Sequence, residues 1–108
     1  MRDYPWLGEY RPWGVSPISL LEIQYLSEVD RLRVRNPEFS DLVISDARFV
    51  VDDVPLHAMV RHALPMTWTR DPFDRLLAAH SGARRVPLCT VDHRILANHS
   101  LIPYELRN

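Results

Sequence analysis

Cysteine and glycine are scarce in this chain of 108 residues, which has one cysteine and three glycines. Because Cys89 has no second cysteine to pair with, an internal disulfide and a cysteine-based zinc site are both excluded. With so few glycines the sequence contains no phosphate-binding loop, no dinucleotide-binding glycine pattern and no G-x-S-x-G nucleophile turn. The enzyme classes that depend on those motifs are therefore excluded.

Long apolar runs are also missing. No stretch approaches the roughly 18 consecutive apolar residues that a membrane span requires. The first 13 residues, MRDYPWLGEYRPW, have no apolar core of the kind found in secretion signals. We therefore expect a cytoplasmic protein that does not contact the membrane.

Lysine is absent, so all 13 basic residues are arginines, and the net charge is -1. Such a balance gives no global positive field that would attract nucleic acid. Any contact with RNA must come from local arginines, whose forked guanidinium groups match phosphate oxygens.

The length and the hydrophobic content of 46% suit one compact domain with one core. Residues 1–13 mix proline, tryptophan, tyrosine and arginine without a period, and we expect an irregular lead-in there. Residues 14–108 are expected to form the domain, with no second domain and no internal repeat.

Helices alternate with short apolar segments along the domain. Pro17, Pro55 and Pro72 stand where helices are expected to begin, because proline is tolerated in the first turn. The helix from Pro17 should turn an apolar face inward, and Ser19 with Glu22 fits a capping box. The helix from Pro55 should end at Pro65, and the helix from Pro72 near Ser81, with Gly82 as its stop. The apolar faces expected for the first two helices comprise Leu20, Leu21, Ile23, Leu26, Val29 and Leu32, and Leu56, Met59, Val60, Ala63 and Leu64.

Between and after these helices lie the predicted strands and one short helix. A very short strand should end at Gly14–Ser16, a second should cover Arg48–Val51, and Val86–Thr90 reads as a buried strand that contains Cys89. A short helix is expected over Asp92–Asn98, and Leu101–Pro103 as a final edge strand. The stretch 33–46 is charged, with Asn36-Pro37 as a break. This alternation predicts an α/β layer fold with a mostly parallel sheet.

Acidic residues stand at the starts of three predicted helices: Glu22, the pair Asp71 and Asp74, and Asp92. Taken singly, each is best interpreted as a cap, because carboxylates satisfy free N–H groups and the helix dipole. Taken together, they predict a site, because helices that follow parallel strands begin at the same edge of a sheet. Carboxylates that converge there repel one another unless a cation is bound. Mg²⁺ or Mn²⁺ with such oxygen ligands can position water for attack on a phosphodiester.

Three segments carry a resemblance to a known family. Residues 69–79 read TRDPFDRLLAA and closely resemble the hRDPFDRLLxAxA segment of VapC-like PIN-domain toxins. Residues 15–23, VSPISLLEI, are similar to the VSxxSLxEI segment of that family, and residues 87–95, PLCTVDHRI, to its PLLTxDxxI segment. The order and the spacing of the three agree with the family.

The resemblance implies a PIN-like three-layer α/β fold, in which a short parallel sheet is flanked by helices. It also implies an endoribonuclease that uses Mg²⁺ (or Mn²⁺), is commonly a homodimer and is inhibited by a VapB-type antitoxin. Glu22, Asp74 and Asp92 match the family's metal-binding acids, Asp71 matches the other aspartate of RDPFDR, and Thr90 matches a residue beside the metal. Arg70, Arg75 and Arg94 flank these acids and are candidate RNA contacts; the alternative is that they only balance neighbouring carboxylates.

One element of the family pattern is missing. The family opens with a strand that ends in an aspartate, as in L-L-D-T, and Asp3, the one early aspartate here, follows no apolar strand. In PIN folds that strand lies in the centre of the sheet and carries a metal ligand. We therefore expect an N-terminally truncated, incomplete PIN-like domain with weak or no activity. A start assigned too late explains this better than a decayed gene or a fragment that folds by direct strand pairing.

Two other functions stay open: a non-catalytic PIN remnant that docks an antitoxin-like partner, and an α/β domain whose acids are only caps. The remaining polar and aromatic candidates are better explained by structure than by chemistry. The histidines lack an i, i+4 metal pair, Cys89 is expected in the core, and the tryptophans suit packing better than base stacking. These residues are His57, His62, His80, His93, His99, Trp6, Trp13 and Trp68.

Overall fold

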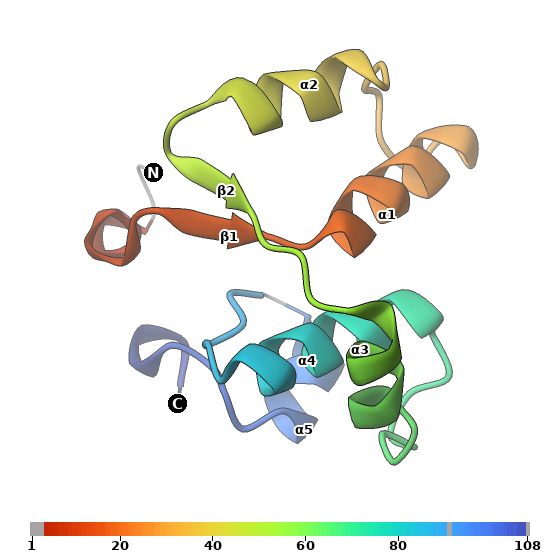
Figure 1. The fold of residues 1–108 in the computed structure, drawn as a ribbon, viewed down its shortest axis with the longest axis vertical. Helices are drawn as coiled ribbons and strands as arrows, with labels where there is room; N and C mark the ends of the chain where they lie inside the picture. Colours follow the sequence, from red (N-terminus) through yellow and green to blue (C-terminus); the bar gives the residue numbers. More distant parts are fainter. Residues whose placement is uncertain (1–3, 91, 108) are drawn as a thin grey trace. The chain divides into compact units, whose positions relative to one another are not determined.

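The computed structural model describes residues 4–90 and 92–107. Helices dominate, and one two-stranded parallel sheet accompanies them, so the mixed α/β class predicted from the sequence is confirmed (Figure 1). The chain divides into two compact units, Met1–Asp53 and Val54–Asn108. Within the described ranges no helix is both long enough and apolar enough to cross a bilayer.

The first unit contains the sheet. Strand β1 (Trp13–Val15) pairs in parallel with β2 (Phe49–Val51), and Gly14 lies opposite Val50. Helices α1 (Pro17–Glu28) and α2 (Glu38–Ser45) connect the two strands. Both short strands had been predicted from the sequence.

Helix α1 begins as predicted, but Ser16 caps it. The Ser16 hydroxyl accepts a hydrogen bond from the N–H of Ile18 at 3.2 Å. Ser19 is already the third residue of the helix, so the capping box predicted for Ser19 and Glu22 is wrong. The predicted inward apolar face is realised only in part: Leu20, Ile23 and Leu26 are half-buried, whereas no residue of α1 is fully buried and Leu21 is 59% exposed. Two strands of three residues offer too little surface to cover such a face.

Two parts of the first unit are more regular than predicted. The lead-in forms the 3₁₀ helix η1 (Pro5–Tyr10), and the Trp13 indole N–H holds it by donating to the Leu7 carbonyl at 2.8 Å. Helix α2 lies in the stretch predicted as charged and broken. Asn36, one residue before the N-cap Pro37, supports the first turn, since its side-chain oxygen accepts from the N–H and the hydroxyl of Ser40 at 3.1 and 2.9 Å.

The second unit holds the hydrophobic core. Helices α3 (Leu56–Ala63) and α4 (Pro72–Arg84) lie side by side, followed by α5 (His93–Asn98) and the 3₁₀ helix η2 (Tyr104–Leu106) (Figure 1). The buried apolar side chains of the described residues all lie in this unit: Val54, Met59, Ala63, Ala78, Ala79, Ile95 and Ile102.

Helix α3 buries a narrower stripe than predicted. Met59 and Ala63 are buried, whereas Leu56, Val60 and Leu64 are 61%, 40% and 68% exposed. Packing against one neighbouring helix covers one row of side chains at i and i+4 spacing. The remaining three apolar side chains form an exposed ridge on α3.

Helix α4 continues past the glycine that was predicted to stop it. Gly82 is helical, and the left-handed residue at the C-terminus is Arg85, with a φ of 56°. The N–H of Val86 donates to the Ser81 carbonyl at 3.1 Å, which closes the helix end in the manner of a Schellman motif.

The two strands predicted in the second unit are not formed. Val86 is 56% exposed and Cys89 is exposed, so the buried strand and the buried cysteine predicted at residues 86–90 are wrong. Leu101–Pro103 is not a strand either, although Ile102 is buried. One ladder-like hydrogen bond joins the two segments, from the Leu88 N–H to the Leu101 carbonyl at 2.8 Å. A strand requires a continuous ladder with a neighbour, and a single bond does not provide one.

Candidate acidic site at the starts of α4 and α5

Helices α4 and α5 begin with the same local arrangement. The Thr69 hydroxyl accepts from the N–H of Asp71 at 3.1 Å, and the Thr90 hydroxyl accepts from the N–H of Asp92 at 3.0 Å. Each aspartate then caps its helix. Asp71 Oδ1 accepts from Phe73 N–H at 2.8 Å, and Asp92 Oδ1 accepts from Ile95 N–H at 3.0 Å. The capping role predicted for both aspartates is therefore confirmed.

Asp74 is the third residue of α4, and its backbone N–H lies 3.4 Å from Oδ1 of Asp71. Burial raises the pKa of its carboxyl group, and the negative charges of Asp71 and Asp92 raise the pKa further. The positive charge of Arg94 acts in the opposite direction. The charges of Asp71, Asp92 and Arg94 therefore all act on the Asp74 carboxyl group within the second unit.

The grouped acids leave oxygens that no helix uses. Capping occupies Oδ1 of Asp71 and of Asp92, which leaves Oδ2 of each for another partner. Over residues 4–90 and 92–107, however, no set of three or more histidine, cysteine or acidic side chains has the arrangement of a metal site. The two helix starts therefore supply a partial set of oxygen ligands.

Glu22, the remaining predicted acid, lies on α1 in the first unit, and its side chain is half-buried. The acids that the structure brings together, Asp71, Asp74 and Asp92, belong to the second unit. A fourth oxygen ligand from Glu22 stays a prediction.

The flanking arginines differ in what they contact. Arg75 donates from Nη2 to the Leu64 carbonyl at 3.2 Å, beyond the C-terminus of α3, and its Nε is buried. This contact ties α4 to α3 and uses a group that was considered for RNA binding. Arg70 and Arg94 are exposed, and Arg94 is the cation whose charge reaches Asp74. Arg94 is therefore the best placed of the three to meet a phosphate near the acids.

Two polar features escaped the sequence analysis. Thr69 is only 3% exposed, and its signal in the sequence was the Thr-x-Asp pattern that occurs at both 69–71 and 90–92. His99 Nε2 lies 2.9 Å from the hydroxyl of Ser81, which donates to the Val86 carbonyl at 2.5 Å. No spacing rule predicts that pair, because 18 residues separate its members.

No family model, curated protein or solved structure matches this chain. The resemblance to VapC-like PIN domains therefore depends on the three quoted segments, and two of them contain the helix starts described above.

Proposed function

We propose that this chain is a metal-dependent endoribonuclease of the VapC type. The observation that carries the proposal is the placement of Asp71, Asp74 and Asp92 at the starts of two helices of one unit, where capping uses only Oδ1 of Asp71 and of Asp92. The raised pKa of Asp74, which follows from burial and from the charges of Asp71 and Asp92, supports it. Carboxylates that repel one another lower the stability of the fold, and cation-binding sites keep such groups together because the cation removes the repulsion. The RDPFDR and T-x-D segments, which contain these acids, support the same family.

The donor set fits a hard divalent cation. Carboxylate oxygens of Asp74 and Asp92 would hold Mg²⁺ or Mn²⁺, with Asp71 beside them and Glu22 brought in from α1. The bound ion would supply positive charge that stabilises the phosphodiester during in-line attack by water. Asp74 and Asp92 would orient the attacking water, and Arg94 and Arg70 would hold phosphate oxygens. A PIN-like fold, a VapB-type antitoxin, a homodimer and a cytoplasmic location belong to the same proposal.

The test is cleavage of structured RNA in the presence of Mg²⁺. Asp74→Asn should lower the rate about 100-fold or more, the usual loss when one electrostatic group of an active site is removed. Asp41→Asn makes the same chemical change on the first turn of α2 and should leave the rate unchanged. Equal cleavage by the unaltered protein and by Asp74→Asn would reject this site as the source of activity.

Cation binding is tested separately by thermal unfolding. A cation that binds only the folded chain raises the melting temperature. Mn²⁺ should therefore raise the melting temperature of the unaltered protein and have less effect on Asp74→Asn. No shift in either protein would leave the acids as helix caps alone.

A non-catalytic protein-binding module is the second candidate. The exposed ridge of Leu56, Val60 and Leu64 on α3 favours it, because apolar side chains at i, i+4 and i+8 suit a helix-mediated contact. In that case the chain should not cleave RNA, and Leu64→Gln should weaken binding to a VapB-type antitoxin. Asp74→Asn should leave the antitoxin affinity unchanged.

A further inference from the structure

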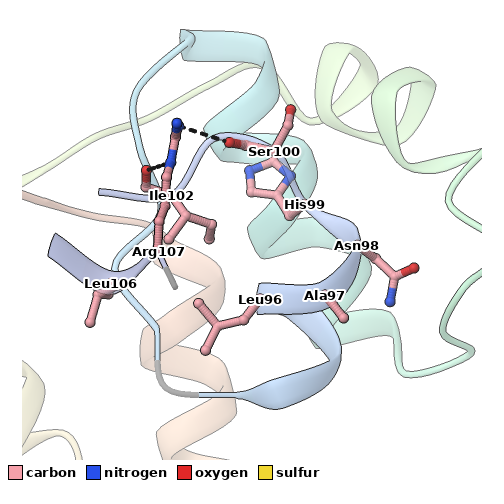
Figure 2. A pocket seen from close by; sticks show the side chains of 8 residues that line it. All are labelled: Leu96, Ala97, Asn98, His99, Ser100, Ile102, Leu106 and Arg107. Atoms are coloured by element: carbon pink, nitrogen blue, oxygen red, sulfur yellow. Dashed lines mark hydrogen bonds between the residues drawn. The ribbon is translucent and has the colours of Figure 1, made fainter. Parts of the chain in front are cut away.

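A pocket of the second unit lies along the C-terminal half of α5 and the segment that follows it. Its volume is about 570 Å³, within the range of pockets that take small molecules. Figure 2 shows the lining side chains, which come from residues 96–107 alone. The N-terminus of α5, with Asp92, is at the other end of that helix.

One cation lines this pocket, and its position is fixed. Arg107 donates from Nε to the Ile102 carbonyl at 3.1 Å and from Nη2 to the Ser100 carbonyl at 3.2 Å (Figure 2). These two bonds use one edge of the guanidinium and leave the Nη1 hydrogens and one Nη2 hydrogen for another acceptor. No lining side chain is acidic. Arg107 is therefore the cation among the lining residues, and its forked Nη1/Nη2 edge carries hydrogens that these two bonds do not use.

The other lining residues are partly polar (Asn98, His99 and Ser100) and partly aliphatic. Leu96, Ala97, Ile102 and Leu106 contribute the apolar surface of the pocket, and no phenylalanine, tyrosine or tryptophan is among the lining residues. An aliphatic wall favours a branched hydrocarbon group, whereas sites that hold unpaired bases use aromatic stacking. The lining therefore disfavours nucleic acid as the occupant.

We propose that this pocket binds a carboxylate that carries a branched aliphatic group. A single guanidinium neutralises one negative charge and pairs with a planar carboxylate through two parallel N–H···O bonds. The same chemistry is presented by a free branched-chain acid and by the C-terminal leucine of a polypeptide. The inference is independent of the ribonuclease proposal, because it uses none of the acids at the starts of α4 and α5.

The experiment is a titration of the ¹⁵N-labelled protein followed by amide chemical shifts. 4-Methylpentanoate should shift the amides of residues 96–107, and 4-methylpentanamide, which has the same shape without the charge, should shift them far less. A short peptide that ends in leucine is then compared with its C-terminal amide. Tighter binding of the free-acid peptide than of 4-methylpentanoate identifies a polypeptide terminus as the source, and the reverse identifies a small acid.

Two variants test the role of the arginine. Arg107→Gln should weaken 4-methylpentanoate binding about tenfold, because a charge-assisted pair is lost. Arg61→Gln removes an exposed arginine of α3 and should leave the affinity unchanged. Equal shifts with acid and amide, shifts outside residues 96–107, or displacement of the acid by a short oligouridine would each overturn the proposal. The comparison of acid with amide uses the unaltered protein, so it decides the matter even if Arg107→Gln does not fold.

Discussion

The hydroxyl of Thr69 accepts a hydrogen bond from the backbone N–H of Asp71 at 3.1 Å, and Asp71 in turn caps α4. This relationship fixes the backbone just before the helix, so that Oδ1 of Asp71 reaches the N–H groups of Phe73 and Asp74 at 2.8 and 3.4 Å. Asp74 is thereby held at the start of the helix, close to Asp71. The same pair at Thr90 and Asp92 sets the start of α5.

Removing the cap should lower the free energy of unfolding. Asp71→Ala should cost about 1 kcal/mol, the usual loss for a helix N-cap, whereas Asp71→Ser keeps an oxygen acceptor and should restore most of it. Urea denaturation monitored by circular dichroism measures both. An equal loss in Asp71→Ser would mean that the charge, and not the cap, is what stabilises α4.

Thr69 should stabilise the fold mainly through its hydroxyl oxygen, which accepts a hydrogen bond from the Asp71 N–H. Thr69→Val keeps the shape but leaves the N–H of Asp71 without its acceptor, and we expect a loss of about 1–3 kcal/mol in unfolding free energy. Thr69→Ser retains the oxygen and removes one methyl group, so it should cost about 1 kcal/mol or less. If the two variants were equally unstable, packing of the methyl group would outweigh the hydrogen bond.

Two glycine substitutions at the C-terminal end of α4 should raise the free energy of unfolding. Arg85 holds a left-handed conformation that costs a side-chain-bearing residue roughly 1 kcal/mol, so Arg85→Gly should raise the free energy of unfolding by about that amount. Gly82 lies inside the helix, and a Cβ there would meet His62 Nδ1 at 3.8 Å, an ordinary contact. Gly82→Ala should therefore add about 0.5–1 kcal/mol. A loss of stability in Arg85→Gly would contradict the helix end described here.

Local chemistry explains which elements could be predicted from the sequence. The pairs Ser16-Pro17 and Asp71-Pro72 predict where a helix begins to within a few residues. Helices α1 and α4 begin there. Residues 86–90 are apolar enough for a strand, but a strand depends on ladder partners elsewhere in the chain, and composition does not reveal them. Asn36-Pro37 was predicted as a break, and a turn is found there, but the helix α2 that follows it was not predicted.

Some features of the candidate site could also be predicted from the sequence, and others could not. Asp71 and Asp92 could be predicted as caps because each directly precedes its helix, and their neighbourhood with Asp74 follows from two helix starts in one unit. The contact between Arg75 and the Leu64 carbonyl could not be predicted, because it depends on how α4 packs against α3. The pairing of Ser81 with His99 depends on tertiary packing as well.

Asp74 should lower stability at neutral pH. Its folded-state pKa is raised above the ordinary value of 3.8, so the folded chain holds this proton more tightly than the unfolded chain does. Stability is then lost as the pH rises from about 3.8 through the folded-state pKa, and the loss persists at pH 7. Asp74→Asn should raise the melting temperature at pH 7 and have a smaller effect near pH 3. Arg94→Gln removes the compensating cation and should lower the melting temperature at pH 7.

The pairing of His99 with Ser81 predicts that stability is lost in mild acid, whereas Asp74 lowers stability as the pH rises. The Ser81 hydroxyl donates to the Val86 carbonyl, so it accepts from His99 Nε2–H, and burial lowers the pKa of His99 below its ordinary value of 6.5. The unfolded chain then binds the proton more readily, and stability is lost as the pH falls from about 6.5 through the folded-state pKa of His99. His99→Gln keeps a side-chain N–H for Ser81 and removes the titration, so its unfolding free energy should depend less on pH between about 5 and 7. A midpoint above 6.5 in the NMR titration of His99 in the folded chain, or an unchanged pH dependence in His99→Gln, would show that burial does not control this histidine.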